Sequence, residues 1–252
     1  MTSNSATVKS ATPNQRLAGR VALVTGASGG IGRAVASRLV SEGASVTAIG
    51  RDKDRLESLL RAVDGSRINL RQVDLTDDRS RCALVTELSS GPRVDLLVLS
   101  AGVYSRGGHN DAPLQSLDDL LATNVRAPYA LIQALLPSLR AGGGDLVVVN
   151  SSQGIRASGG LGQYAATQHA MRAITDSLRQ EVNGDGVRVC IIHTGRVATP
   201  MQEKIFRDEG RPYRADLLLQ PDDIATVVMT VLSLPDEAEI TEIHLRPAKK
   251  TY

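Results

Sequence analysis

The sequence predicts a single α/β domain, a doubly wound seven-stranded parallel sheet with helices on both faces. Short runs that are apolar throughout alternate with longer segments of helical periodicity. Strands that are apolar on both faces are typical of parallel sheets covered by helices. No repeat or linker divides residues 19–252, so one domain is expected there. The polar residues 1–18 are expected to form a flexible tail.

Seven runs are predicted to be strands because each is short and apolar along its length. They are residues 20–25, 44–49, 67–73, 94–99, 145–149, 187–192 and 240–245. Helices are expected where apolar residues recur every three or four positions, as Leu56, Leu59, Leu60 and Val63 do. The expected helices are residues 31–41, 52–63, 77–88, 117–139, 163–182 and 222–234.

The composition excludes several classes of protein. Among 252 residues, 29 Lys and Arg oppose 27 Asp and Glu, and this balance argues against binding to nucleic acid or to a membrane surface. No apolar run approaches the roughly 20 residues of a membrane helix. Cys82 and Cys190 cannot form a disulfide framework, which favours a cytoplasmic location. No cluster of His, Cys, Asp and Glu has metal-ligand spacing, so no metal is expected.

A glycine-rich turn follows the first predicted strand and begins a helix. Glycines permit the tight turn, and the N–H groups of a helix N-terminus attract phosphate. The turn predicts a dinucleotide site, although glycine could also serve only the geometry of the turn. The predicted cofactor-binding residues here are Gly26, Ser28, Gly29, Gly30, Ile31 and Gly32.

The end of the second strand predicts which dinucleotide is bound. NAD enzymes usually place an acid there for the ribose 2′-hydroxyl, whereas an Arg accommodates a 2′-phosphate. This chain has Arg51, which favours NADP(H) over NAD(H), unless Arg51 is simply a solvated residue. After the third strand, Asp74 is expected to accept from the adenine amino group or to cap its own turn, with Leu75 beside it.

Further motifs lie at the ends of the predicted strands and within the predicted helices. Thr25, Gly26, Gly30 and Gly32 form a TGxxxGxG pattern, Ser100-Ala101-Gly102 follows the fourth strand, Asn124 lies in a long helix, and Ser151 precedes Tyr164 by 13 residues. The segment of Gly195, Val197 and Thr199 follows the sixth strand. With these motifs, the chain from Leu17 to its C-terminus resembles the short-chain dehydrogenase/reductase family, which has a single Rossmann-fold domain.

The resemblance implies a carbonyl or alcohol oxidoreductase that uses a nicotinamide cofactor. Tyr164 would be the proton donor in reduction, Ser151 would polarise the substrate oxygen, and Asn124 would hold a water in the proton relay. The implied cofactor contacts also include Ser100, Ala101, Gly102, Tyr164, Gln168, Gly195, Val197 and Thr199.

The chain departs from the family at Gln168, where the motif Tyr-x-x-x-Lys has lysine. Residues four apart share a helix face, so Gln168 lies beside Tyr164. It can hydrogen-bond the nicotinamide ribose but cannot lower the Tyr164 pKa by charge. Without a lysine, Tyr164 would lose a pKa decrease of about 1–3 units, which corresponds to a roughly 10- to 1000-fold lower rate. This loss should affect oxidation more than reduction. Arg172, two turns along, either lends a remote charge or is solvated.

Other residues leave alternatives open. Thr194 replaces the family's proline before Gly195, and Ser100 replaces its asparagine. Residues 195–220 are expected to form a mobile lid over the substrate. Arg106 and His109 either touch substrate or are solvated, and His193 lies either at the cofactor edge or in the core.

Three functions remain open. The first is an NADP(H)-dependent oxidoreductase of carbonyls or alcohols that favours reduction. The second is a redox-neutral reaction at the same pocket, and the third is a non-catalytic NADP(H) sensor or partner subunit. Alanines on the helix that carries Tyr164 suggest a homodimer or homotetramer, unless they pack within one chain.

Overall fold

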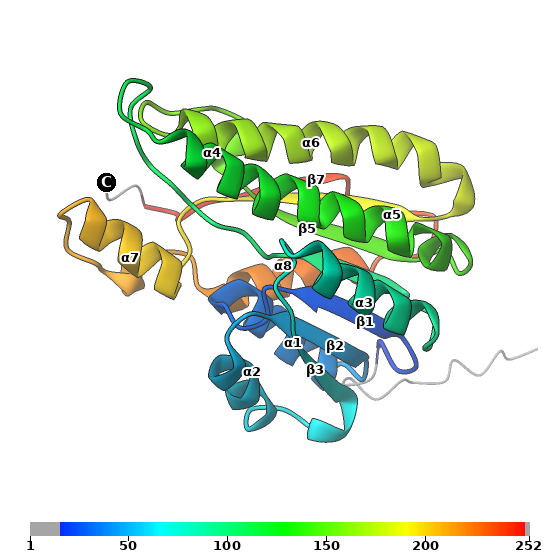
Figure 1. Cartoon of the computed structure of the whole chain (residues 1–252). Coiled ribbons are helices and arrows are strands. Elements are labelled where there is room, and N and C mark those ends of the chain that lie inside the picture. Colours follow the sequence, from blue (N-terminus) through cyan, green and yellow to red (C-terminus); the bar gives the residue numbers. More distant parts are fainter. Residues whose placement is uncertain (1–15, 250–252) are drawn as a thin grey trace, which may run out of the picture.

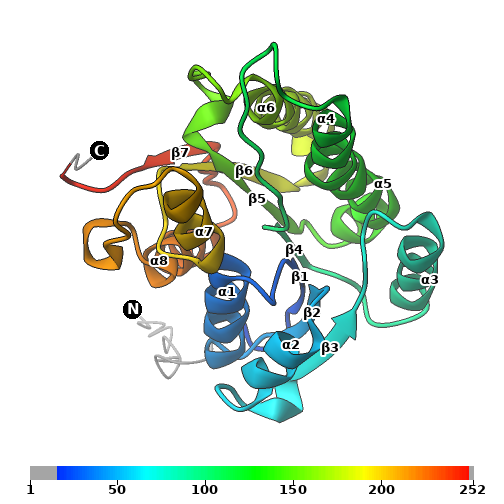
Figure 2. The ribbon, with the colours of Figure 1, turned by 60° about the vertical axis from the view of Figure 1, so that its left-hand side comes forward.

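The computed structural model describes residues 16–249. Its seven strands form one parallel sheet, as the sequence predicts, and their order in the sheet is β3-β2-β1-β4-β5-β6-β7 (Figures 1 and 2). The order reverses direction between β1 and β4, which makes the sheet doubly wound. The strands are β1 Val21–Thr25, β2 Ser45–Gly50, β3 Ile68–Gln72, β4 Leu96–Leu99, β5 Asp145–Ser151, β6 Arg188–Thr194 and β7 Glu242–Leu245.

Helices cover both faces of the sheet (Figure 2). They are α1 Gly30–Ser41, α2 Lys53–Leu60, α3 Asp78–Ser89, α4 Leu114–Leu121, α5 Ala127–Arg140, α6 Gly162–Val182, α7 Pro200–Asp208 and α8 Pro221–Leu232. On one face the core contains residues of α1, α2 and α8, and on the other residues of α3, α5 and α6. Alternation along each strand divides the core, because Ala22 and Val24 face the first layer while Leu23 faces the second.

The structure corrects several predicted boundaries. The single helix expected over residues 117–139 consists of α4, a π-helical turn at Ala122–Arg126, and α5. The strands β5 and β6 extend to Ser151 and Thr194, two residues beyond their predicted ends. Their last residues are polar, so hydrophobicity alone did not mark them.

The N-terminal boundary also differs from the prediction. Residues 1–15 of the expected tail lie outside the described residues. Leu17, which the sequence assigned to the tail, is buried, and its N–H donates to the Glu42 carbonyl at 2.9 Å. Its side chain packs in the core layer of α1 and α8, so the packed region begins before residue 19.

No helix within residues 16–249 combines the length and the apolar character needed to cross a bilayer.

Candidate active site

A cavity of about 970 Å³ opens at the carboxyl ends of the strands. This edge is where doubly wound sheets bind ligands, beside the point at which the strand order reverses. Every residue predicted from the sequence to bind cofactor or to act in catalysis lines this one cavity. The fold thus brings together residues from Gly26 to Thr199.

The glycine turn is shaped by close contacts between backbones. Gly26 has a φ of +71°, and a Cβ there would lie 2.8 Å from the Ala101 nitrogen. A Cβ on Gly32 would lie 2.5 Å from the Gly26 carbonyl oxygen. Both glycines are therefore required for the turn to pack against the end of β4.

The N-terminus of α1 is available for an anion. Gly29 at its N-cap makes no side-chain capping hydrogen bond, and the first turn carries no acidic residue. By contrast, Asp52, Asp77 and Thr199 cap α2, α3 and α7 through their side chains. Uncapped N–H groups at the positive end of a helix dipole suit a phosphate, so these residues fit the pyrophosphate of a dinucleotide.

The departure at Ser100 has a structural explanation. Its hydroxyl donates to the Thr25 carbonyl at 2.6 Å, and the Thr25 hydroxyl accepts from the Ser100 and Ala101 N–H groups at 3.1 and 3.2 Å. These bonds join the ends of β1 and β4 at the floor of the cavity. Serine therefore supplies a cross-strand hydrogen bond at this position.

The charged side chains beyond β2 and β3 differ in the hydrogen bonds that they make within the protein. Asp52 lies next to Arg51, but its carboxylate accepts from the Arg55 N–H at 3.0 Å as the cap of α2. Asp74 accepts from the Thr76 N–H at 2.9 Å and hydroxyl at 2.7 Å, and these two hydrogen bonds hold the pKa of Asp74 below its usual range. The turn-capping interpretation of Asp74 is thus confirmed. Arg51 is exposed at the cavity wall.

Asn124 lies in the π-helical turn between α4 and α5, where extra residues bulge a helix and often mark functional sites. Its side chain accepts from the Val103 N–H at 2.8 Å and donates to the Val103 carbonyl at 2.9 Å. The same amide lies 3.2 Å from the Thr167 hydroxyl on α6. Asn124 therefore connects the segment after β4 with the helix that carries Tyr164.

Ser151 and Tyr164 line the cavity together. Burial raises the pKa of Tyr164 to about 12, while the interaction with the Ser151 side chain acts in the opposite direction and Tyr104 raises the pKa further. The Tyr104 ring packs edge-on against Tyr164, with 5.1 Å between centroids. No signal in the sequence points to Tyr104, because a lone loop tyrosine has no distinguishing pattern.

Gln168 lies one turn after Tyr164, at the buried wall of the cavity. Its side-chain Nε2 donates to the Thr167 hydroxyl at 3.3 Å, and its main-chain carbonyl accepts from the Asn150 side chain at 3.0 Å. No cation is among the groups that shift the Tyr164 pKa. Arg172 does not replace one: its guanidinium lies 3.4 Å from Glu242 on β7, and its side chain is 36% exposed.

The segment predicted to be a lid contains a helix, α7, which begins at Thr199 and Pro200. At its end the buried Glu209 carboxylate contacts Arg196 at 3.1 Å and Arg106 at 2.9 Å. Burial acts to raise the pKa of Glu209, but these two cations outweigh it and the pKa is lowered. Arg106 and Glu209 both line the cavity, whereas His109 does not. The ion pair joins the loop after β4 to the lid.

Three side chains that could bind a metal lie close together outside the cavity. The sequence shows no cluster with metal-ligand spacing, but the structure brings His193, Glu242 and His244 together on β6 and β7. The two strands lie about 50 positions apart in the chain, so local spacing could not reveal the group. His193 is buried, as the core alternative expects.

Comparison with known proteins agrees with this geometry. Residues 20–210 match the family model described as short chain dehydrogenase. An uncharacterised oxidoreductase of Staphylococcus haemolyticus is 32% identical over 233 residues, covering 92% of this chain and 98% of the relative. An uncharacterised NAD-dependent oxidoreductase of Mycobacterium tuberculosis is 34% identical over 244 residues, covering 84% of this chain and 89% of the relative.

Among solved structures, the closed form of a serine dehydrogenase complexed with NADP⁺ superimposes with a TM-score of 0.82. It is 27% identical and the match covers 92% of this chain and 96% of that one. The seven-stranded parallel sheet, the family model and the relatives agree, so the chain is an oxidoreductase enzyme that belongs to the short-chain dehydrogenase family.

Proposed function

We propose that this enzyme is an NADP(H)-dependent oxidoreductase that transfers hydride between nicotinamide and a small carbonyl or alcohol substrate, and that it favours reduction. The observation that carries the proposal is that Ser151 and Tyr164 lie in the same cavity as the glycine turn. The bound nicotinamide would supply or accept the hydride. The protein's own residues would supply the proton and orient the substrate.

The reductive preference rests on the protonation state of Tyr164. Its pKa of about 12 keeps the phenol protonated across the physiological range, so it is ready to donate a proton to a carbonyl oxygen, with Ser151 as the second hydrogen-bonding group. Oxidation instead needs tyrosinate, which at pH 8 would be roughly one molecule in 10,000. Gln168 provides no charge to increase that fraction.

The preference for NADP(H) rests on Arg51. The adjacent Asp52 accepts a hydrogen bond at the start of α2, and Asp74, whose charge interacts with Arg51, accepts hydrogen bonds within its own turn, so both carboxylates already have donors of their own. One relative is described as NAD-dependent, and one similar structure is an NADP⁺ complex. The assignment therefore depends on this chain's own residues.

A redox-neutral reaction at the same pocket is the second candidate. It is favoured by one observation, the absence of a cation among the groups that shift the Tyr164 pKa. In that case Ser151 and Tyr164 would act by hydrogen bonding and would not need tyrosinate.

We also infer a homo-oligomer located in the cytoplasm. Leu121 and Tyr129 are exposed, and with Val125, Arg126 and Ile174 they line an apolar depression on α4, α5 and α6. Ala166 and Ala173 on α6 are exposed as well. Small and apolar residues on an outer helical surface favour contact with a second copy.

The test is titration with NADPH and NADH by cofactor fluorescence, followed by assays on a panel of carbonyl compounds. Replacing Tyr164 by Phe should reduce turnover by about 10²- to 10⁴-fold without changing the NADPH dissociation constant. Tyr129→Phe, which removes an exposed hydroxyl outside the cavity, is the matched control. Retention of full turnover by Tyr164→Phe would refute the proposed role. Tight NADPH binding with no carbonyl reduced would favour the redox-neutral reaction.

A further inference from the structure

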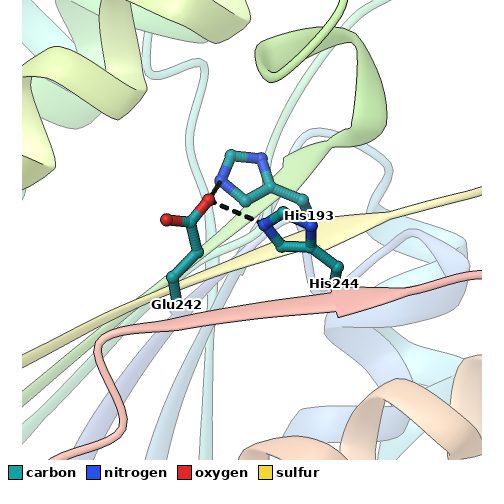
Figure 3. Close-up of side chains that lie close together, drawn as sticks. All are labelled: His193, Glu242 and His244. Atoms are coloured by element: carbon teal, nitrogen blue, oxygen red, sulfur yellow. Dashed lines mark hydrogen bonds and ion pairs between the residues drawn. The ribbon is translucent and has the colours of Figure 1, made fainter.

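Three potential metal ligands lie together at the free end of the sheet, on β6 and β7. In the parallel pairing of these strands His193 lies opposite His244, and Ile191 lies opposite Glu242. Glu242 and His244 are two residues apart and therefore point to the same face of β7. Figure 3 shows both imidazole rings directed at one carboxylate oxygen of Glu242.

The distances bring three ligand atoms to one point. Nε2 of His193 lies 3.0 Å and Nε2 of His244 lies 2.8 Å from Oε1 of Glu242. All three ligand atoms lie within 4.8 Å of one another. Ligands around a tetrahedral zinc ion are about 3.3 Å apart, so only small side-chain shifts would admit the ion.

His193 cannot satisfy both of its neighbours as a neutral ring. Its Nδ1 lies 3.1 Å from the Ser151 carbonyl oxygen, which only accepts, so Nδ1 must carry the proton. Neutral imidazole then has a lone pair on Nε2, and this lone pair faces a carboxylate that also only accepts. Within the described residues, the buried Nε2 makes no hydrogen bond. A cation between Nε2 and Oε1 would remove the conflict.

A proton is the less suitable cation at this place. The His193 side chain is completely buried, and a buried charged ring is costly. The neutral ring is the form that binds metals. The Nδ1–H bond to a backbone carbonyl is also the usual way in which a ligating histidine is oriented.

The ligand set and the surroundings indicate which metal would bind. Two imidazole nitrogens and one carboxylate oxygen are typical of zinc sites that keep a fourth position for water. His244 is 57% exposed, so an ion can enter from solvent. Arg172 lies 3.4 Å from the other carboxylate oxygen, Oε2, and leaves Oε1 to the ion. Its positive charge would reduce the affinity without blocking the site.

We propose that His193, Glu242 and His244 form a Zn²⁺-binding site on β6 and β7, in which the ion fixes the His193 ring against the main chain of Ser151. This site is separate from the cavity, because none of its three ligands lines it. The inference therefore does not depend on the reaction proposed above.

The test is a titration of the metal-free full-length protein with ZnCl₂ in competition with a chromophoric chelator. A Cys82→Ser background removes the exposed thiol, which could also bind zinc. One equivalent of Zn²⁺ should bind, and CoCl₂ should give the visible absorption of a four- or five-coordinate Co²⁺ ion. His244→Ala and Glu242→Gln should each weaken binding at least about tenfold.

Two histidines outside the group serve as matched controls. His109→Ala and His169→Ala should bind Zn²⁺ as the parent does, because both residues are exposed and neither belongs to the group. We expect His193→Gln to be less stable because the His193 side chain is buried, so the two more exposed ligands carry the test, with thermal unfolding as the check on folding. Binding far below one equivalent, or equal binding by the parent and His244→Ala, would overturn the proposal. A loss of Zn²⁺ binding in His109→Ala as large as that in His244→Ala would also overturn it.

Discussion

Burial is the main influence on the pKa of the Tyr164 hydroxyl, and Ser151 offsets only part of the increase. One helical turn after Tyr164, Gln168 supplies a hydrogen-bonding group but no charge. The geometry of the site and its electrostatics are therefore separable, and a single substitution can introduce a charge at position 168.

We predict that Gln168→Lys accelerates alcohol oxidation at pH 8 by roughly 10- to 1000-fold, because a cation within 4–6 Å lowers a pKa by about 1–3 units. In the parent, the oxidation rate should rise about tenfold per pH unit between pH 7 and 10, since the tyrosinate fraction grows toward a pKa of about 12. In the Gln168→Lys variant, the oxidation rate should level off at a pH that is about 1–3 units lower than in the parent. Gln180→Lys, exposed at the far end of α6, is the control. Identical pH profiles in the parent and Gln168→Lys would contradict this account.

A second residue-scale prediction concerns Arg51. Arg51→Asp should weaken NADPH binding by about 10- to 100-fold, the value of a hydrogen bond to a charged group, and leave NADH binding unchanged or tighter. Fluorescence titration measures both constants. Arg61→Asp makes the same change of charge at the end of α2, outside the cavity, and should have no effect. Equal losses for NADPH and NADH would show that Arg51 does not contact a 2′-phosphate.

At the scale of elements, ion pairs connect the end of α7 with the loop after β4. Glu209 is buried between Arg106 and Arg196, while Arg106 is 53% exposed. Exposed ion pairs contribute only about 0.2–1 kcal/mol, so the contact can break and reform without unfolding the domain. This suits a lid that must open for substrate.

Removing this contact should affect substrate more than cofactor. We predict that Arg106→Ala raises KM for the carbonyl by up to about fivefold, the equivalent of 1 kcal/mol, with an unchanged NADPH dissociation constant. Steady-state kinetics at saturating NADPH provide the measurement. Lys204→Ala removes an exposed ion pair with Asp208 on the same helix and should leave KM unchanged. A loss of NADPH affinity in Arg106→Ala would place Arg106 in the cofactor site instead.

At the scale of the whole molecule, the apolar depression on α4, α5 and α6 lies away from the cavity. We predict that the parent sediments as a dimer or tetramer and that Leu121→Glu shifts it toward monomer, because the carboxylate would be buried in the interface. Leu114→Glu is the control, since Leu114 is 71% exposed and lies outside the depression. Analytical ultracentrifugation distinguishes the outcomes, and a monomeric parent would refute the prediction.

The sequence by itself determined the fold class, the seven strands and the residues that meet in the cavity. It did so because apolar periodicity is local, and because parallel strands all end at one edge of the sheet. The glycine turn, Ser151 and Tyr164 each follow or begin an element, so their places in sequence fixed their places in space. Gln168 was evident for the same reason, one helical turn from Tyr164.

Only the tertiary structure decided what depends on contacts between distant segments. The helix α7 carries a Thr199–Pro200 start that could have predicted it, but its charged residues hid the burial of Ile205 and Phe206. The pairing of Arg106 with Glu209 and the meeting of His193 with Glu242 and His244 join segments that are about 50 to 100 residues apart. Such contacts follow from the register of strands and the closure of loops, and no short-range pattern in the chain encodes either of them.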